Sequence, residues 1–322
     1  MKIKFSTKAR TIISLDKIIQ TAKIPKSFFF TVKDWKDNKE NIKKKIINIF
    51  GDTFFIVRSS CKKEDKINYS NSGAFLSLQD VKAINLESSI NKVIKSYKII
   101  QDEDEVLIQP MLKNVISSGV AFSHDPNTLS PYRIINWSEG SDTTSVTSGF
   151  GGKVWQQAAK SPYKPPYIIR PILNLIEELL EIFNNVPVDC EFAITKEKKQ
   201  CKLWLLQVRP LILRKYPESE IDQSKKLELI AKKIEKGMHP QTFLMGRRTV
   251  YGVMPDWNPA EILGIRPKPL ALSLYRELIT DSIWAYQRHN YGYRNLRSFP
   301  LITHFLGLPY VDARLSFNSF IP

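Results

Sequence analysis

The stretch VDCEFAITKEKKQCKLWLLQVRP, residues 188–210, contains two strand-like runs on either side of a charged turn. Side chains two positions apart in a β-strand point to the same face of the sheet. The two runs therefore predict a β-hairpin with one polar face. Alternation assigns to that face Asp189, Glu191 and Ala193 of the first strand and Leu205, Gln207 and Arg209 of the second.

The register of this hairpin decides which polar side chains meet. If the turn centres near Lys199, Glu191 lies opposite Gln207 and Asp189 lies opposite Arg209. Carboxylate and amide oxygens suit Mg²⁺, and a guanidinium offers phosphate a fork of donors. An exposed hairpin with an ordinary salt bridge has the same pattern, so the hairpin alone leaves both interpretations open.

Another arginine follows an apolar run. The residues FFIV, 54–57, predict a strand that is buried on both faces and ends at Arg58. A loop rich in serine and glycine covers 70–77, and such loops can present backbone N–H groups to phosphates. The run EVLIQPML, 105–112, is expected to place the main-chain amides of its last two residues beside an apolar slot. That arrangement suits an adenine edge, and a plain core strand fits equally well.

Composition sets wider bounds. The 322 residues are 43% hydrophobic and 25% charged, as in soluble globular proteins, and no apolar run approaches the roughly 20 residues that span a bilayer. Three cysteines form neither a disulfide framework nor a metal-binding pair, so a reducing cytoplasm is expected. The net charge of +16 is scattered along the chain. Nucleic-acid binding, which would be steeply salt-dependent, is therefore the weakest interpretation.

The pattern of elements predicts an α+β protein. Helical periodicity covers 7–23, 38–50, 86–100 and 171–185, with strands between these segments. After Pro210 the chain becomes charged and helical over 214–248, which is expected to be a linker. Residues 249–322 are rich in aromatic residues and proline and are expected to form a helical segment of unknown role, with an end that looks truncated.

Taken together, the motifs resemble the nucleotide-binding domain of phosphoenolpyruvate synthases and pyruvate phosphate dikinases. The resemblance covers roughly residues 1–213. It rests on several motifs in the family's order, namely VRSS at 57–60, S-x-x-G at 70–73, Q-x-M at 109–111, SGVAFSHDP at 118–126, D-x-E at 189–191 and LLQVRP at 205–210. The resemblance implies an ATP-grasp fold, with two lobes at roughly 1–100 and 101–213 around ATP and Mg²⁺.

The resemblance also implies roles for particular residues. Glu191 and Gln207 match the Mg²⁺ ligands, and Asp189 is their neighbour. Three residues match groups that bind the phosphates and assist transfer: Lys8, Arg58 and Arg209. The loop over the phosphates corresponds to Gly73, Ala74 and Ser77, and the adenine hinge to Gln109, Met111 and Leu112. The family's glycines before the lysine are replaced by Phe5, Ser6 and Thr7, and the loop is more apolar than in the family.

The resemblance implies an ATP- and Mg²⁺-dependent phosphotransferase that passes a phosphoryl group to a histidine. None of the chain's four histidines has the small-residue setting of that acceptor, so a further domain or a partner chain is expected to supply it. Two alternatives stay open. One is a related phosphotransferase acting on a small molecule or polysaccharide, and the other is a non-catalytic ATP-grasp module that binds a partner.

Overall fold

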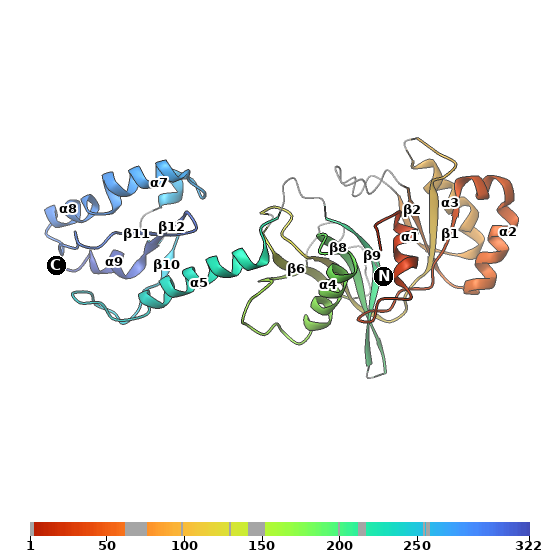
Figure 1. Ribbon diagram of the computed structural model, residues 1–322, viewed down its shortest axis with the longest axis horizontal. Helices are drawn as coiled ribbons and strands as arrows, with labels where there is room; N and C mark the ends of the chain where they lie inside the picture. Colours follow the sequence, from red (N-terminus) through yellow and green to blue (C-terminus); the bar gives the residue numbers. More distant parts are fainter. Residues whose placement is uncertain are drawn as a thin grey trace. The chain divides into compact units, whose positions relative to one another are not determined.

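All three sheets in the described part of the chain are antiparallel, and helices accompany each of them. This computed structural model therefore confirms the α+β class (Figure 1). By their contacts the residues separate into unit 1, Met1–Gln223, and unit 2, Ser224–Pro322. The described residues are 3–61, 76–97, 99–128, 130–140, 152–198, 200–211, 217–253, 255 and 258–322.

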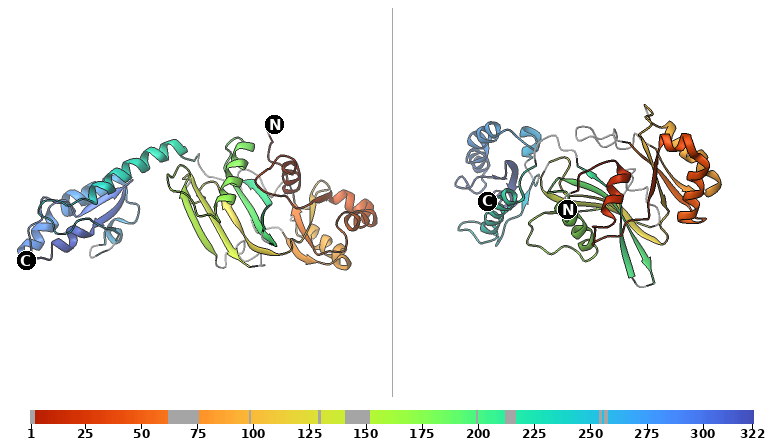
Figure 2. Two further views of the ribbon diagram at one scale, coloured as in Figure 1. Left: turned by 90° about the horizontal axis from the view of Figure 1, so that it is seen from below. Right: turned by 45° about the vertical axis from the view of Figure 1, so that its right-hand side comes forward.

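The larger sheet of unit 1 has five strands in the order β7-β6-β5-β8-β9. Helix α4 (Arg170–Ile182) packs on this sheet (Figure 2). It buries leucine and isoleucine side chains in a core that includes Phe192. A proline in the first turn of α4 starts this helix, as the sequence predicts. The strands are β5 (Val115–Phe122), β6 (Tyr132–Glu139), β7 (Lys153–Ala158), β8 (Val188–Glu197) and β9 (Gln200–Pro210).

The smaller sheet of unit 1 has four strands in the order β1-β4-β2-β3. Its elements are β1 (Phe28–Thr31), α2 (Val32–Phe50), β2 (Phe55–Ser60), β3 (Ser77–Val81), the short 3₁₀ turn η1 (Ala83–Asn85), α3 (Leu86–Lys95) and β4 (Glu105–Pro110). Helices α2 and α3 bury one face of this sheet in a core that includes Trp35, Ile46 and Ile90. All six residues of β2 are buried, and the strand runs two residues beyond Arg58.

Helix α1 (Lys8–Leu15) packs against elements of both sheets. Its Ala9, Ile12 and Leu15 join the core of the larger sheet, which also includes Leu107 of β4. The helix is shorter than the expected span 7–23. After Leu15 the amides of Ile18 and Ile19 both donate to the Leu15 carbonyl, which closes a turn and ends the helix.

Unit 2 contains a small sheet that the sequence interpretation of 249–322 as helical did not include. The sheet has the order β10-β12-β11, in which β11 and β12 are joined through Leu306 and Gly307, both with positive φ. Two positive φ values suit the tight turn of a β-hairpin. The elements are β10 (Tyr251–Gly252), α6 (Pro259–Leu263), α7 (Pro269–Tyr275), the π-helical turn η2 (Arg276–Thr280), α8 (Ile283–Asn290), β11 (Ile302–Phe305), β12 (Leu308–Asp312) and α9 (Ala313–Asn318).

The charged helix α5 (Glu220–Gly237) lies within the range 214–248 that the sequence predicts as a linker. Its first residues belong to unit 1 and the others to unit 2. None of the helices among the described residues is long and apolar enough to cross a membrane.

Candidate functional site

The β8–β9 hairpin has the register expected from its sequence. Glu191 pairs with Gln207, and Asp189 pairs with Arg209. Side chains of directly opposed residues lie on the same face of a sheet, so the carboxylates, the amide and the guanidinium share one face. The predicted register, with these four polar groups on one face of the hairpin, is confirmed.

Arg58 reaches this face from the other sheet of unit 1. Its Nη1 donates to Glu191 Oε2 at 3.2 Å and to Gln207 Oε1 at 3.2 Å. These partners stand 133 and 149 positions later in the chain. The Arg58 side chain is 10% exposed, so the two sheets meet around a nearly buried guanidinium.

The contact with Arg58 shows what the Glu191 and Gln207 oxygens can hold. Both oxygens point at one cationic nitrogen, so together they present a converging pair of acceptors to a positive charge. The Glu191 side chain is 28% exposed and is accessible to an ion from solvent. Mg²⁺ is bound by one or two such oxygens together with substrate phosphates, so this donor set fits it. Among the described residues, no group of three histidine, cysteine, aspartate or glutamate side chains could hold a metal by itself.

The Asp189–Arg209 pair lies beside these oxygens. Arg209 Nε donates to both carboxylate oxygens of Asp189, at 2.8 and 2.9 Å. Asp189 is 13% exposed and Arg209 28% exposed. A charge-assisted contact with little solvent around it fixes the direction of the guanidinium, next to Gln207 on the same strand face.

A β-bulge in β9 corrects one prediction about this face. Glu191 pairs with Gln207, but the next residue, Phe192, pairs with Leu205, so Leu206 is the extra residue. Alternation resets at such a bulge. Leu205 therefore lies with Phe192 in the core and does not share a face with Gln207.

A pocket adjoins Arg58 at the edge where β2, β4 and β9 meet. All three predicted adenine-hinge residues, Gln109, Met111 and Leu112, line it with Arg58. The other lining residues are Pro25, Ile56, Pro110, Val115 and Leu206. Sequence reasoning missed the contribution of Leu206, because strand alternation does not reveal a bulge.

One detail of the predicted hinge is wrong. The Met111 amide donates to the Phe54 carbonyl at 2.8 Å, so it does not face the pocket as a donor for an adenine edge. Of the two amides proposed for that task, the Leu112 amide remains. The Gln109 side chain also has a partner, because its Nε2 donates to Ser27 Oγ at 2.9 Å. The apolar walls of this pocket are thus better supported than its hydrogen-bonding edge.

The remaining predicted residues belong to segments next to Arg58. Lys8 is the first residue of α1, and the amide of the following residue, Ala9, donates to Ser60 Oγ at 2.9 Å. The helix start thus lies at the end of β2, two residues from Arg58. Ser77 opens β3 and pairs directly with Arg58. The predicted residues Gly73 and Ala74 lie outside the described residues.

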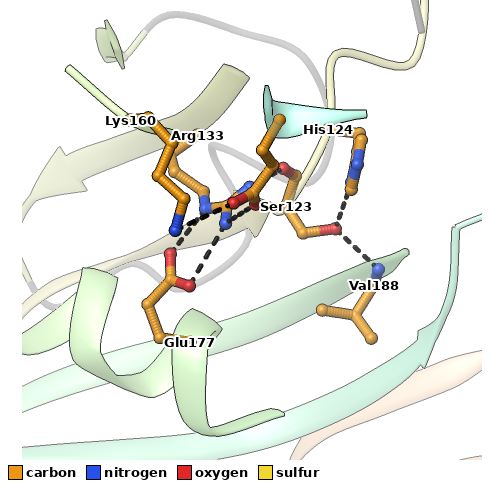
Figure 3. A network of polar contacts seen from close by, with 7 residues as sticks. Ser123, His124, Arg133, Lys160, Glu177 and Val188 are labelled. Carbon is orange, nitrogen blue, oxygen red and sulfur yellow. Dashed lines mark hydrogen bonds and ion pairs between the residues drawn. The ribbon is translucent and has the colours of Figure 1, made fainter. Parts of the chain in front are cut away.

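A second polar cluster in unit 1 surrounds Arg133 (Figure 3). The buried Arg133 guanidinium binds the carboxylates of Glu177 at 2.7 Å and Glu220 at 2.5 Å, and donates to the Ser123 carbonyl at 2.7 Å. These bonds tie β6 to α4 and to the start of α5. Lys160 adds an ion pair to Glu220 at 3.2 Å. We call this cluster the Arg133 clamp, because it holds β6, α4 and the start of α5 together.

His124 lies beside this clamp and is also buried. The Val188 amide donates to Ser123 Oγ at 2.8 Å, and that hydroxyl lies 3.0 Å from His124 Nδ1. Either group can donate in this contact, because a hydroxyl and a ring nitrogen can each act as donor or acceptor. Burial and the charge of Arg133 lower the pKa of His124 to about 4. Burial of its side chain makes His124 a poor phosphoryl acceptor.

The lowered pKa of His124 predicts an acid-sensitive fold. In the unfolded chain His124 becomes protonated below about pH 6.5, whereas in the folded chain it becomes protonated only near pH 4. Stability should therefore fall as pH falls through this window, by about 2 kcal/mol at pH 5 from this residue alone. The measurement is urea unfolding of the wild type and of His124→Gln at pH 7 and pH 5. Between these pH values His124→Gln should lose about 2 kcal/mol less free energy of unfolding than the wild type.

The control for this experiment is His289→Gln, which changes an exposed histidine. This variant should lose as much stability as the wild type between the two pH values. Equal losses for the wild type and His124→Gln would show that His124 titrates normally in the folded protein.

Comparison with known proteins adds little detail. No protein-family description and no curated protein matches the chain. Among solved structures, it resembles the D-alanine-D-alanine ligase of Helicobacter pylori with 14% identity and a TM-score of 0.38, over 70% of this chain and 60% of the ligase. The D-alanine-D-alanine ligase of Coxiella burnetii has 9% identity and a TM-score of 0.37, over 71% of this chain and 60% of the ligase. The ligase of Bacillus anthracis has 11% identity and a TM-score of 0.36, over 70% of this chain and 65% of the ligase. The matched region thus spans less than two thirds of each ligase, and likenesses this weak assign no substrate to this chain.

Proposed function

We propose that unit 1 is an ATP-grasp nucleotide-binding domain that binds Mg·ATP between its two sheets and takes part in phosphoryl transfer. The observation that carries this proposal is the meeting of Arg58 with Glu191 and Gln207. A guanidinium and two metal-type oxygens from different sheets converge at the edge of an apolar pocket. Phosphoryl transfer depends on cationic side chains and metal ions that position the phosphates and neutralise their charge.

Each part of the nucleotide has residues that suit it. The pocket lined by Gln109, Met111 and Leu112 would take the adenine. Arg58 and Arg209 would bind the polyphosphate and stabilise the negative charge on the transferred group, with Lys8 at the start of α1. Ser77 lies across from Arg58, and the loop with Gly73 and Ala74 precedes it in the chain. Glu191 and Gln207 would hold Mg²⁺, which when bound neutralises charge on the phosphates, with Asp189 fixing Arg209 beside them.

The acceptor follows from the sequence resemblance and from the histidines of this chain. A phosphoenolpyruvate-synthase-like enzyme would pass the phosphoryl group to a histidine on a further domain or a partner chain. The burial of His124 supports an acceptor elsewhere, because a phosphoryl acceptor has to reach the phosphate. A small molecule or a polysaccharide as acceptor would use the same Arg58 and Glu191, so this choice needs a separate experiment with the acceptor itself.

The proposal is tested by calorimetric titration with a non-hydrolysable ATP analogue. We expect the wild-type chain to bind the analogue with Mg²⁺ and to bind it much less tightly without Mg²⁺. Glu191→Gln keeps the size of the side chain but removes its charge, so it should abolish the difference between the two conditions. Lack of binding by a folded wild-type sample at millimolar analogue would refute the proposed function and favour a partner-binding module.

A further inference from the structure

Glu105 is a buried carboxylate that has no place in the predicted site. It is the first residue of β4 and is 1% exposed. Thr7 Oγ1 donates to Glu105 Oε2 at 2.5 Å, and Arg10 Nε donates to Glu105 Oε1 at 2.5 Å. Both donors come from the start of α1, so each oxygen of this carboxylate holds the same helix end.

The helix end held by Glu105 carries Lys8. Thr7 is the N-cap of α1, and its hydroxyl also accepts from the Arg10 amide at 3.3 Å. The Ala9 amide donates to Ser60 Oγ, and Ser60 pairs with Glu105 across β2 and β4. The first turn of α1 is therefore bonded at two points to the end of the strand pair.

The same strand pair carries Arg58. Residues two apart on a strand share a face, so Arg58 and Ser60 point to the same side of β2. Leu107 of β4 pairs with Arg58 and belongs to the same core as the apolar residues of α1. Two residues earlier on the same strand, Glu105 binds α1 directly. The position of Lys8 relative to Arg58 is thus set through Glu105, Thr7 and Ser60.

Burial of this carboxylate is costly, and stability alone does not require it. An apolar pair of similar size often packs as well as a buried ion pair, and loss of one partner leaves an unpaired charge. Arg10 is 54% exposed, so its attraction to Glu105 is partly screened by solvent. What the carboxylate adds is direction, because its two oxygens accept from donors with fixed geometry.

We propose that Glu105 is a positioning residue that fixes Lys8 against Arg58 and thereby shapes the phosphate-binding end of the site. The residue acts through α1 and does not touch the nucleotide. This inference rests on the proposed Mg·ATP binding of unit 1. It predicts that loss of Glu105 weakens the hold on phosphates and leaves the hold on the adenosine part unchanged.

The experiment compares two ligands on the full chain. Affinities for a non-hydrolysable ATP analogue with Mg²⁺ and for adenosine are measured for the wild type, Glu105→Gln and Thr7→Val. Glu105→Gln removes the charge that assists both bonds to α1, and Thr7→Val removes one of these bonds, so in each variant the analogue should bind about tenfold more weakly while adenosine binding is unchanged. Thr7→Ser, which keeps the hydroxyl, should bind the analogue like the wild type. Thr7→Val supplies the result if Glu105→Gln fails to fold.

The outcomes separate this inference from the proposed function. If Glu105 has a purely structural role, its loss should lower the affinities for both ligands equally or lower neither. Either result would overturn the inference, whereas binding of the analogue by the wild type would still uphold the proposed function. A wild-type chain that does not bind the analogue would remove the proposed function, and the inference with it.

Discussion

Replacement of Arg58 by methionine is expected to lower the affinity of the chain for an ATP analogue with Mg²⁺ by about 100-fold. A guanidinium that binds a polyphosphate through two charge-assisted hydrogen bonds contributes about 3 kcal/mol, which corresponds to this factor. Methionine keeps the length and apolar stem of the side chain and removes its donors and charge. The measurement is calorimetric titration of both proteins at one salt concentration.

The fold should tolerate this change. Within the described contacts, the Arg58 side chain is bonded through Nη1 alone, to the partly exposed Glu191 and to Gln207, and its Nε has no partner. Arg170→Met is the matched control, because Arg170 is an exposed arginine at the start of α4. It should leave the affinity unchanged. An Arg58→Met protein that folds and binds with wild-type affinity would remove Arg58 from the site.

Replacement of Arg133 by methionine is expected to have the largest effect on stability, a loss of about 3 kcal/mol in the free energy of unfolding of unit 1. The substitution leaves three acceptors without their shared donor: the carboxylates of Glu177 and Glu220 and the Ser123 carbonyl. Glu177 is 50% exposed and Glu220 26%, so both regain some hydration. The Ser123 carbonyl is buried and does not regain hydration, so the loss of stability stays large.

Urea unfolding at pH 7 measures this loss, again with Arg170→Met as the control. Glu177→Gln should cost less than Arg133→Met, because it keeps an acceptor for the guanidinium and leaves Glu220 in place. A loss below about 1 kcal/mol for Arg133→Met would mean that the cluster behaves like a surface ion pair. Binding of the ATP analogue to folded Arg133→Met should be unchanged, since no contact links Arg133 to Arg58 among the described residues.

The sequence was a good guide where local chemistry decides the outcome. The pairing of Glu191 with Gln207 follows from turn position and strand alternation, and both are local properties. The burial of Phe55, Ile56 and Val57 follows from their continuous apolar run, whereas the run does not predict that the following polar residues of β2 are buried as well. That Arg58 would meet the hairpin more than 130 positions away came only from the resemblance to a known family, since no local rule connects two distant strands.

Other features depend on tertiary contacts that a linear pattern does not contain. The Met111 amide donates to the Phe54 carbonyl because β2 and β4 pair at that point. No property of residues 105–112 alone predicts this hydrogen bond. The hairpin of unit 2 escaped notice because its turn uses Leu306, a residue that rarely adopts positive φ, before Gly307. In the sequence Glu105 looks like an ordinary strand residue, because its hydrogen bonds go to α1, which is distant in the chain.

The bulge at Leu206 affects how this chain can be compared with others. In a regular strand the neighbours of Gln207 would point away from Arg58, whereas here Leu206 lines the pocket with Arg58 and Gln207 accepts a hydrogen bond from Arg58. An alignment of β9 with an unbulged strand needs a one-residue gap at Leu206. Without that gap, every residue on one side of position 206 is matched to the wrong face, and core positions are mistaken for positions on the polar face.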